Sequence, residues 1–367
     1  MSAPREPVLS RARLSSLRRR YWTALTTVAP HDRAHWPALR VTVCAVAPLA
    51  LMMGLDRPEW APYAVFGSLA AVYGRHQNYR ARLESQATMG AALCVAVVAG
   101  TAVGVVAPAS LLAVAAMALL SVLGLMLSKT CGLLPVPSLF LVFAFGSLSA
   151  YRHTADDLVL AAALSAGSAG FSVAVGQVGR LLPTSRRPRT WPAPRVPLSE
   201  FFAVRDRRLA SVAYVLGPLV AGTVATTAGL GHPYWGSVTA TAPLSGTDTA
   251  TRFARATHRV VGTFAGLGIA YLILASDPGM LWLVAAVALF QVLTELLIAR
   301  NYALAMIAVT PMALILTYLG SPMDVTRLVS DRLIETLIGA AVSVAVLVLL
   351  RPFRTGATGR RGSGGAP

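Results

Sequence analysis

Long apolar runs separated by arginine-rich stretches are the feature that most constrains this chain. Of its 367 residues 55% are hydrophobic and only 13% are charged, against about 25% charged residues in soluble domains. A helix needs about 20 mostly apolar residues to cross a bilayer, and many runs reach that length without strand-like alternation. The sequence therefore predicts an all-α, polytopic membrane protein.

We expect about 12 transmembrane helices, six in each half of the chain. Because six is even, the halves share one orientation, which predicts two parallel six-helix repeats related by an axis along the membrane normal. The predicted spans are 38–55, 61–74, 85–107, 109–128, 135–151 and 158–182, then 208–230, 233–246, 256–275, 279–298, 302–320 and 331–350.

The composition between the spans divides the chain into five parts. A cytoplasmic arginine-rich segment (1–35) precedes the first membrane repeat (36–182). A cytoplasmic linker rich in proline and arginine (183–205) joins it to the second repeat (206–351), and a tail (352–367) is expected to be disordered and cytoplasmic. The N-terminal segment lacks the apolar core of a secretory signal, so we expect no cleaved signal peptide.

The distribution of basic residues predicts the orientation. With the N-terminus in the cytoplasm, only four of the 32 basic residues fall on the outer side, namely Arg57, Arg152, Arg327 and Arg332. We therefore expect a multi-pass protein of the cell (inner) membrane, with the lipid bilayer as a partner and both termini cytoplasmic. The net charge of +17 then reflects topology, and we expect no nucleic-acid partner.

Two short, proline-interrupted apolar stretches stand out from the long spans. One runs from Tyr234 to Leu244; at ~1.5 Å per residue its length of ~18 Å is well short of the bilayer core. The other follows Trp60, which aligns with Trp235. Interrupted short segments are the best sequence indication of a transport site in a membrane protein.

Arginines follow both short stretches. Arg252, Arg255 and Arg259 form one helical stripe that would attract anions at the cytoplasmic mouth, and Arg80 aligns with Arg255 in the first half. The alternative is that each arginine only sets topology. The candidate substrate-binding residues are Arg252, Arg255, Arg259, Thr239, Trp235, Thr310, Trp60 and Arg80, although both tryptophans also suit an interfacial aromatic belt.

Two glutamates within predicted spans are candidates for proton coupling. Glu295 lies near the cytoplasmic end of span 279–298, and Glu335 lies one turn into the last span, four residues after Asp331. Charged groups inside a membrane are costly and usually functional. The alternative for Glu335 is an interfacial salt bridge with Arg332 or Arg327.

No enzyme motif is convincing, so we expect no catalytic activity and no cofactor. The sequence lacks a P-loop, a GxSxG and an HExxH motif. His31 and His35 have the spacing of metal ligands but no third ligand nearby, so no metal site is expected. The three cysteines lie in apolar segments, where they serve as small core residues.

The second half resembles the fusaric acid resistance family of aromatic acid exporters. The resemblance rests on a tryptophan on a short span, a polar stretch and an Arg-x-x-Gly-Thr-x-x-Gly helix, here Arg259, Gly262, Thr263 and Gly266. It continues through Glu295, Tyr302 and Thr310, then Arg332, Glu335, Thr336 and Gly339.

The resemblance implies efflux of aromatic or other small organic acids, driven by the proton gradient. A passive organic-anion channel and a non-transporting membrane scaffold stay open as alternatives, as does assembly into a homo-oligomer.

Overall fold

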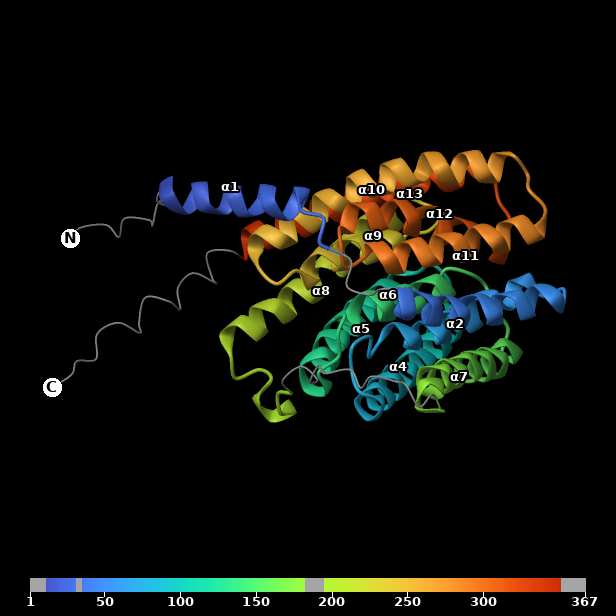
Figure 1. The fold of residues 1–367 in the computed structure, drawn as a ribbon. Helices are drawn as coiled ribbons and strands as arrows, with labels where there is room; N and C mark the ends of the chain where they lie inside the picture. The colour runs from blue at the N-terminus through green and yellow to red at the C-terminus, as the bar shows by residue number, and fades with distance from the viewer. Residues whose placement is uncertain (1–10, 31–34, 182–194, 351–367) are drawn as a thin grey trace, which may run out of the picture.

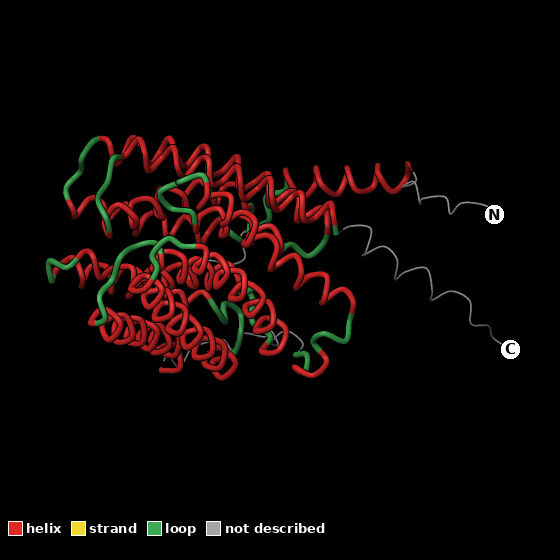
Figure 2. Tube along the Cα trace, turned by 180° about the vertical axis from the view of Figure 1, so that it is seen from behind, coloured by secondary structure: helices red, strands yellow, loops and turns green. Residues whose placement is uncertain are grey.

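The protein is helical throughout the part that the structure describes. The computed structural model describes residues 11–30, 35–181 and 195–350, and these form helices joined by turns, with no β-strand among them (Figure 2). His31, the first part of the predicted linker and the predicted tail lie outside the described residues.

The α-helices and short 3₁₀ helices follow one another in an order that repeats between the two halves. Their bounds are α1 Arg11–Thr26, α2 His35–Gly54, η1 Pro58–Trp60, α3 Ala61–Ser68, η2 Leu69–Val72, α4 Tyr79–Val106, α5 Leu111–Cys131, α6 Ser138–Ser149, α7 Asp156–Gln177, η3 Val178–Leu181, η4 Leu198–Glu200, α8 Arg205–Thr227, α9 Tyr234–Thr241, η5 Ala242–Ser245, α10 Thr249–Ala275, α11 Met280–Leu297, α12 Tyr302–Gly320 and α13 Val325–Leu349.

Nine helices of the described residues are long and apolar enough to cross a membrane: α2, α4, α5, α7, α8 and α10 to α13. They also carry exposed large apolar side chains such as Leu281 and Val106, as helices that face lipid do. The prediction of an all-α polytopic membrane protein is therefore confirmed. Shorter helical segments lie at the other three predicted spans, and the arrangement as twelve crossings in two repeats stays a prediction.

The two short apolar stretches are short because prolines and glycines end them. In the first half α3 carries Pro62 in its first turn and tightens into η2, after which Gly74 adopts a left-handed φ of 73°. In the second half α9 follows Pro233 and tightens into η5 around Pro243. Both segments are buried within the bundle, so these spans lie inside the protein rather than against lipid.

The turn after each short segment is built in the same way. Asn78 caps α4 by accepting the Ala81 N–H at 2.9 Å, and Asp248 caps α10 by accepting the Thr251 N–H at 3.1 Å. Four residues beyond each cap an arginine Nε donates back to the glycine of the turn. These pairs are Arg82 to the Gly74 carbonyl at 3.0 Å and Arg252 to the Gly246 carbonyl at 2.9 Å.

This geometry corrects the sequence alignment of the two halves. Arg82, not Arg80, is the structural counterpart of the α10 arginines, and it corresponds to Arg252 rather than to Arg255. The reason is that the turn before α4 is longer than the turn before α10, so a single offset that aligns Trp60 with Trp235 is out of register beyond the turn. The side chain of Arg80 is 89% exposed and pairs with Glu84.

Corresponding helices of the two halves have corresponding neighbours (Figure 1). In the first half α4 packs on α6 and α7, and α3 packs on α2 and α7; in the second half α10 packs on α12 and α13, and α9 packs on α8 and α13. Between the halves, α5 packs on α8 and α11 packs on α2. Each half therefore uses its fourth helix to contact the first helix of the other half.

Glycines let α10 approach α12 closely. A Cβ at Gly262 would collide with the Ala303 carbonyl oxygen and the Met306 Cβ, and a Cβ at Gly266 would meet the Thr310 Cβ at 2.7 Å. Small residues of this kind allow close helix packing in membranes, where burial from water supplies no attraction between helices. These two glycines of the motif therefore set the distance between α10 and α12.

The amphipathic helix α1 lies alongside the start of α10 (Figure 1). His258 Nε2 lies 2.9 Å from the Leu25 carbonyl oxygen, and Arg300 Nε donates to the Ala29 carbonyl oxygen at 3.0 Å. Asn301 Nδ2 donates to the Thr27 carbonyl oxygen at 3.1 Å. Polar side chains of the second half therefore hold the backbone at the end of this N-terminal segment.

The glycine packing gives a first prediction. Gly262→Ala should lower the stability of the purified protein by about 1–3 kcal/mol, because the added methyl group has to displace α12 backbone. Gly268→Ala on the same helix should be neutral or stabilising by up to roughly 1 kcal/mol, because no atom lies within 4 Å of the added Cβ. Thermal unfolding in detergent measures both, and equal melting temperatures would contradict the close packing.

Candidate functional site

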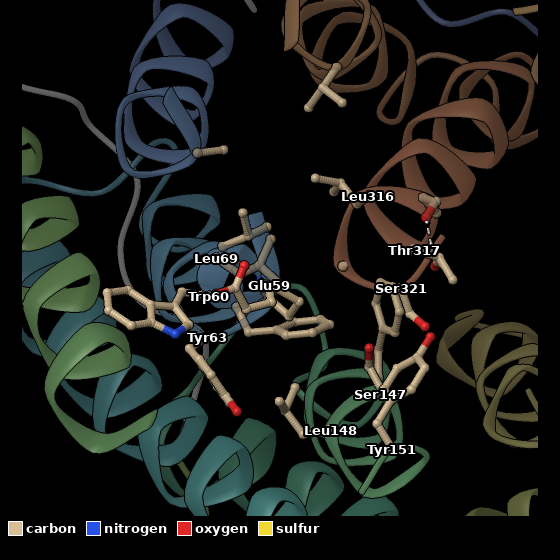
Figure 3. Close-up of a pocket in the computed structure, with 18 of the residues that line it drawn as sticks. Glu59, Trp60, Tyr63, Leu69, Ser147, Leu148, Tyr151, Leu316, Thr317 and Ser321 are labelled. Atoms are coloured by element: carbon tan, nitrogen blue, oxygen red, sulfur yellow. Dashed lines mark hydrogen bonds between the residues drawn. The ribbon is translucent and has the colours of Figure 1, made fainter. Parts of the chain in front are cut away.

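A cavity with a volume of about 440 Å³ lies between the two halves of the molecule. Trp60, Tyr63 and Leu69 line it from the first short segment, and Leu316, Thr317 and Ser321 face them from the end of α12 (Figure 3). Ser147 and Tyr151, at the end of α6, form a third wall (Figure 3).

The lining is aromatic with a few polar groups. Phe66 and Phe143 join Trp60, Tyr63 and Tyr151 to give ring surfaces, while serine, threonine and glutamine side chains supply hydrogen-bonding groups. Pockets that bind small organic molecules have this composition, with the polar groups fixing orientation. The volume is also within the usual range of such pockets.

The connections that line the cavity all belong to one end of the bundle. They are the α2–α3, α6–α7 and α12–α13 connections, which contribute Glu59, Arg152, His153 and Ser321. These are three of the connections that the charge distribution predicts to face outward. The cavity therefore lies toward the predicted outer side.

Charged residues lie beneath the inner end of the cavity. Gln291 of α11 lines the cavity, and Glu295 lies one turn further along the same face. Arg75 Nη2 lies 3.5 Å from a Glu295 carboxylate oxygen and donates to the Glu295 backbone carbonyl at 2.6 Å. Arg40 of α2 lies within electrostatic range of both. This charged layer joins the halves between the cavity and the predicted cytoplasmic end.

A second buried polar cluster lies behind the aromatic wall. The guanidinium of Arg332 stacks 3.7 Å from the centroid of the Trp235 ring, and Arg332 is only 1% exposed. Glu335, one turn further along α13, accepts the His232 backbone N–H at 3.1 Å. The sequence counted Arg332 with the outer connections, although it lies at the first residues of predicted span 331–350. In the structure α13 begins already at Val325, so Arg332 lies about two turns inside the helix and is buried in the bundle.

The three arginines of the predicted stripe on α10 make different contacts. Arg252 supports the turn before its helix, as described above. Arg255 Nη1 donates to Ser245 Oγ at 2.7 Å and lies over the Tyr302 ring. Arg259 is buried and donates to the Tyr302 hydroxyl at 3.1 Å. Only Arg259 also lies within electrostatic range of Arg332.

The remaining predicted residues are scattered. Trp60 lines the cavity, and Trp235 forms the floor beneath Arg332. Thr239 is fully buried with an unpartnered hydroxyl, whereas the Thr310 hydroxyl donates to the Met306 carbonyl within its own helix. Arg80 contacts neither the cavity nor the buried cluster. The structure therefore places Trp235, Arg259 and Glu335 around Arg332, whereas Trp60 lines the cavity and Glu295 lies beneath it.

Some site residues and one contact escaped the sequence reasoning. Tyr63, Tyr151 and Gln291 line the cavity, and nothing in the sequence indicated that Arg75 pairs with Glu295. Gln291 had a recognisable signal, since it is a polar residue four positions before Glu295 in a very apolar span. Arg40 had none beyond its charge near the start of a span.

Asp331 forms a salt bridge near the start of α13. Arg327 Nε lies 3.9 Å from an Asp331 carboxylate oxygen, which also accepts the Gly231 N–H at 3.1 Å. Nearby, burial lowers the pKa of His232 from 6.5 to about 4. His232 is therefore neutral at physiological pH and supplies no positive charge to Glu335. Among the described residues no group of three or more histidine, cysteine or acidic side chains is arranged to hold a metal ion.

These features define a class: a polytopic helical membrane protein with a cavity for a small molecule between its two halves. Residues 219–346, from α8 to α13, match the family model described as fusaric acid resistance protein-like. The resemblance to the fusaric acid resistance family seen in the sequence is therefore confirmed over these residues.

A curated relative matches a similar share of the chain. The uncharacterized membrane protein YvaC of Bacillus subtilis (strain 168) is 32% identical over 129 residues, which cover 35% of this chain and 20% of that protein. The matched part thus spans about a fifth of the relative's length. No solved structure matches the chain.

The buried ion pair beneath the cavity yields a second prediction. Arg75→Ala or Glu295→Ala alone should cost about 3 kcal/mol of stability, because each leaves the opposite charge buried without its partner. The double variant should lose less than the sum of the two single losses.

The surface pair of Arg80 and Glu84 is a matched control, since its side chains are 89% and 48% exposed. Its coupling should amount to no more than about 0.2–1 kcal/mol in the same double-mutant cycle. Similar coupling energies for the two pairs, measured by thermal unfolding, would show that the Arg75–Glu295 pair is not an interior contact.

Proposed function

We propose that this protein is a membrane transporter that exports aromatic or other small organic acids by a proton-coupled secondary mechanism. The observation that carries the proposal is the cavity between the halves, because its aromatic walls and scattered hydroxyl groups suit an aromatic ring with a polar substituent. The family of residues 219–346 supports a transporter rather than an enzyme.

Two parallel six-helix repeats would supply the movement. Equivalent neighbours in the two halves, and the matched turns at Arg82 and Arg252, support this architecture. Transport sites of repeat-built transporters lie at the repeat interface, and access alternates as one repeat rocks against the other. The ion pair of Arg75 and Glu295 would have to separate when the cytoplasmic side opens.

Glu295 and Glu335 are the proposed proton-coupling residues. Both are buried, and each lies near an arginine: Glu295 near Arg75, and Glu335 near Arg332. Protonation of either glutamate would remove the negative charge that balances its arginine. A passive anion channel is the second candidate, favoured by the large number of arginines near the predicted cytoplasmic mouth. It needs no proton site. Assembly into a homo-oligomer stays a prediction.

The deciding experiment is flux in proteoliposomes. A panel of aromatic and aliphatic carboxylates, with and without a pH gradient, should show accumulation that Glu295→Gln or Glu335→Gln abolishes. Passive flux that neither the gradient nor these substitutions affects would favour the channel. Absence of flux for every compound would overturn transport.

The cavity itself is tested by filling it. Thr317→Trp places a large ring inside the cavity and should reduce flux by roughly tenfold or more. A tenfold reduction corresponds to about 1.4 kcal/mol of lost substrate-binding free energy. Ser276→Trp, at an exposed position after α10, should leave flux unchanged. A Thr317→Trp variant that inserts and transports normally would show that substrate does not pass through this cavity.

The proposed orientation can be checked at the two ends of α10. Thr247 and Ser276 are both exposed and flank the helix. A membrane-impermeant thiol reagent should label Ser276→Cys in intact cells, and it should label Thr247→Cys only after permeabilisation. The reverse pattern would place both termini outside.

A further inference from the structure

Two buried arginines converge in the second half without acidic partners of their own. Arg259 on α10 is 2% exposed and Arg332 on α13 is 1% exposed, and they lie within electrostatic range of each other. Among the described residues no acidic oxygen lies within 4.0 Å of either guanidinium. Two buried like charges without ion pairs are strongly unfavourable unless another negative group joins them.

Several polar atoms of these arginines and of the helices α9 and α10 are also left unpaired. Arg259 Nε, Arg332 Nε and Arg332 Nη1 are buried without a hydrogen-bond partner. The hydroxyls of Thr239 and Thr263 and the indole N–H of Trp235 are likewise buried and unpartnered. Buried polar groups are normally satisfied, so a group of unused donors on three packed helices indicates a binding site for an acceptor.

We propose that Arg259 and Arg332 bind the carboxylate of a monovalent organic acid, with the Trp235 indole N–H and the Thr239 and Thr263 hydroxyls as further donors. This inference rests on the proposed transport function and names the chemistry of its substrate site. Guanidinium groups suit this ligand because their N–H groups match carboxylate oxygens in a paired, planar geometry.

Glu335 determines which ligand charge the site binds best. The titratable and charged groups facing it are Asp331 and Arg332 on its own helix, His232 and Tyr234 from the α8–α9 turn and α9, and Tyr151 from the α6–α7 connection. Its Oε2 is buried without a partner. With Glu335 ionised, two guanidinium groups and one carboxylate leave one positive charge, which a monocarboxylate neutralises and a dicarboxylate exceeds.

The site lies directly behind the wall of the cavity. The ring of Phe143, which lines the cavity, has its centroid 4.6 Å from that of Trp235, and Trp235 stacks on Arg332. Tyr151, also in the lining, lies with its hydroxyl 3.1 Å from His232 Nε2, and the His232 backbone binds Glu335. Substrate in the cavity reaches the arginines when the rings of Phe143 and Trp235 separate.

Equilibrium binding to the purified full-length protein tests the site at about pH 8, where the exposed carboxyl groups of the probes are ionised. The probes are benzoate, its neutral analogue benzamide, and the dicarboxylate phthalate. Wild type should bind benzoate and should bind benzamide and phthalate more weakly. Arg259→Gln and Arg332→Gln should each weaken benzoate binding by roughly tenfold or more, because a charge-assisted hydrogen bond is lost. Arg208→Gln, which removes an exposed arginine at the start of α8, should change nothing.

The Glu335→Gln variant distinguishes a role of this cluster in carboxylate binding from a purely structural role. Removing this negative charge should shift the preference from benzoate toward phthalate, which no purely structural contact predicts. The double variant Arg332→Gln with Glu335→Gln should recover the melting temperature lost in Arg332→Gln but should not recover benzoate binding. Recovery of both, or an unchanged preference in Glu335→Gln, would overturn the proposed site.

The flux assay distinguishes this inference from the transport function itself. Wild-type flux that survives Arg259→Gln and Arg332→Gln with unchanged affinity would leave a transporter whose carboxylate site lies elsewhere. A wild-type protein that neither binds nor transports any carboxylate would refute both.

Discussion

A helix in a bilayer has to satisfy its own backbone, and this constraint shapes the centre of the protein. Two apolar segments are too short to cross and end in tight turns within the bundle, which exposes backbone groups that lipid cannot satisfy. The caps at Asn78 and Asp248, and the arginines that bind the carbonyls of Gly74 and Gly246, meet this need in each half. Charged side chains are therefore needed inside the bundle for structural reasons, before any function is considered.

The same necessity gives some of the arginines here a structural role. Arg82 donates to two carbonyl groups of its turn and to one of α7, and the Nε of Arg252 donates to the turn before α10. Arg332 is different, because its nitrogens have an aromatic ring beside them but no acceptor. A buried cation without an acceptor is a feature that stability alone does not favour, and functional sites are where such conflicts are tolerated.

The sequence was a good guide to the helices and a poor guide to the contacts between them. Apolar run length predicted the long helices, because that property is local, and the prolines predicted the short segments. The counterpart of Arg252 was missed because two turns of unequal length shift the register. The cavity was not predictable, since Tyr63, Gln291 and Thr317 come from elements far apart in the chain and only packing brings them together. Arg332 was misplaced because the last helix begins earlier than its apolar run.

The attachment of α1 has an evolutionary consequence. His258, Arg300 and Asn301 bind carbonyl oxygens of the segment that ends α1, and every amino acid supplies that same oxygen. The second half thus recognises the path of this segment rather than its side chains. Substitutions within residues 25–29 can accumulate with little effect on docking, whereas a change at any of the three polar side chains releases the segment whatever its sequence. Among relatives, residues 25–29 should accordingly vary freely, whereas His258, Arg300 and Asn301 should vary little.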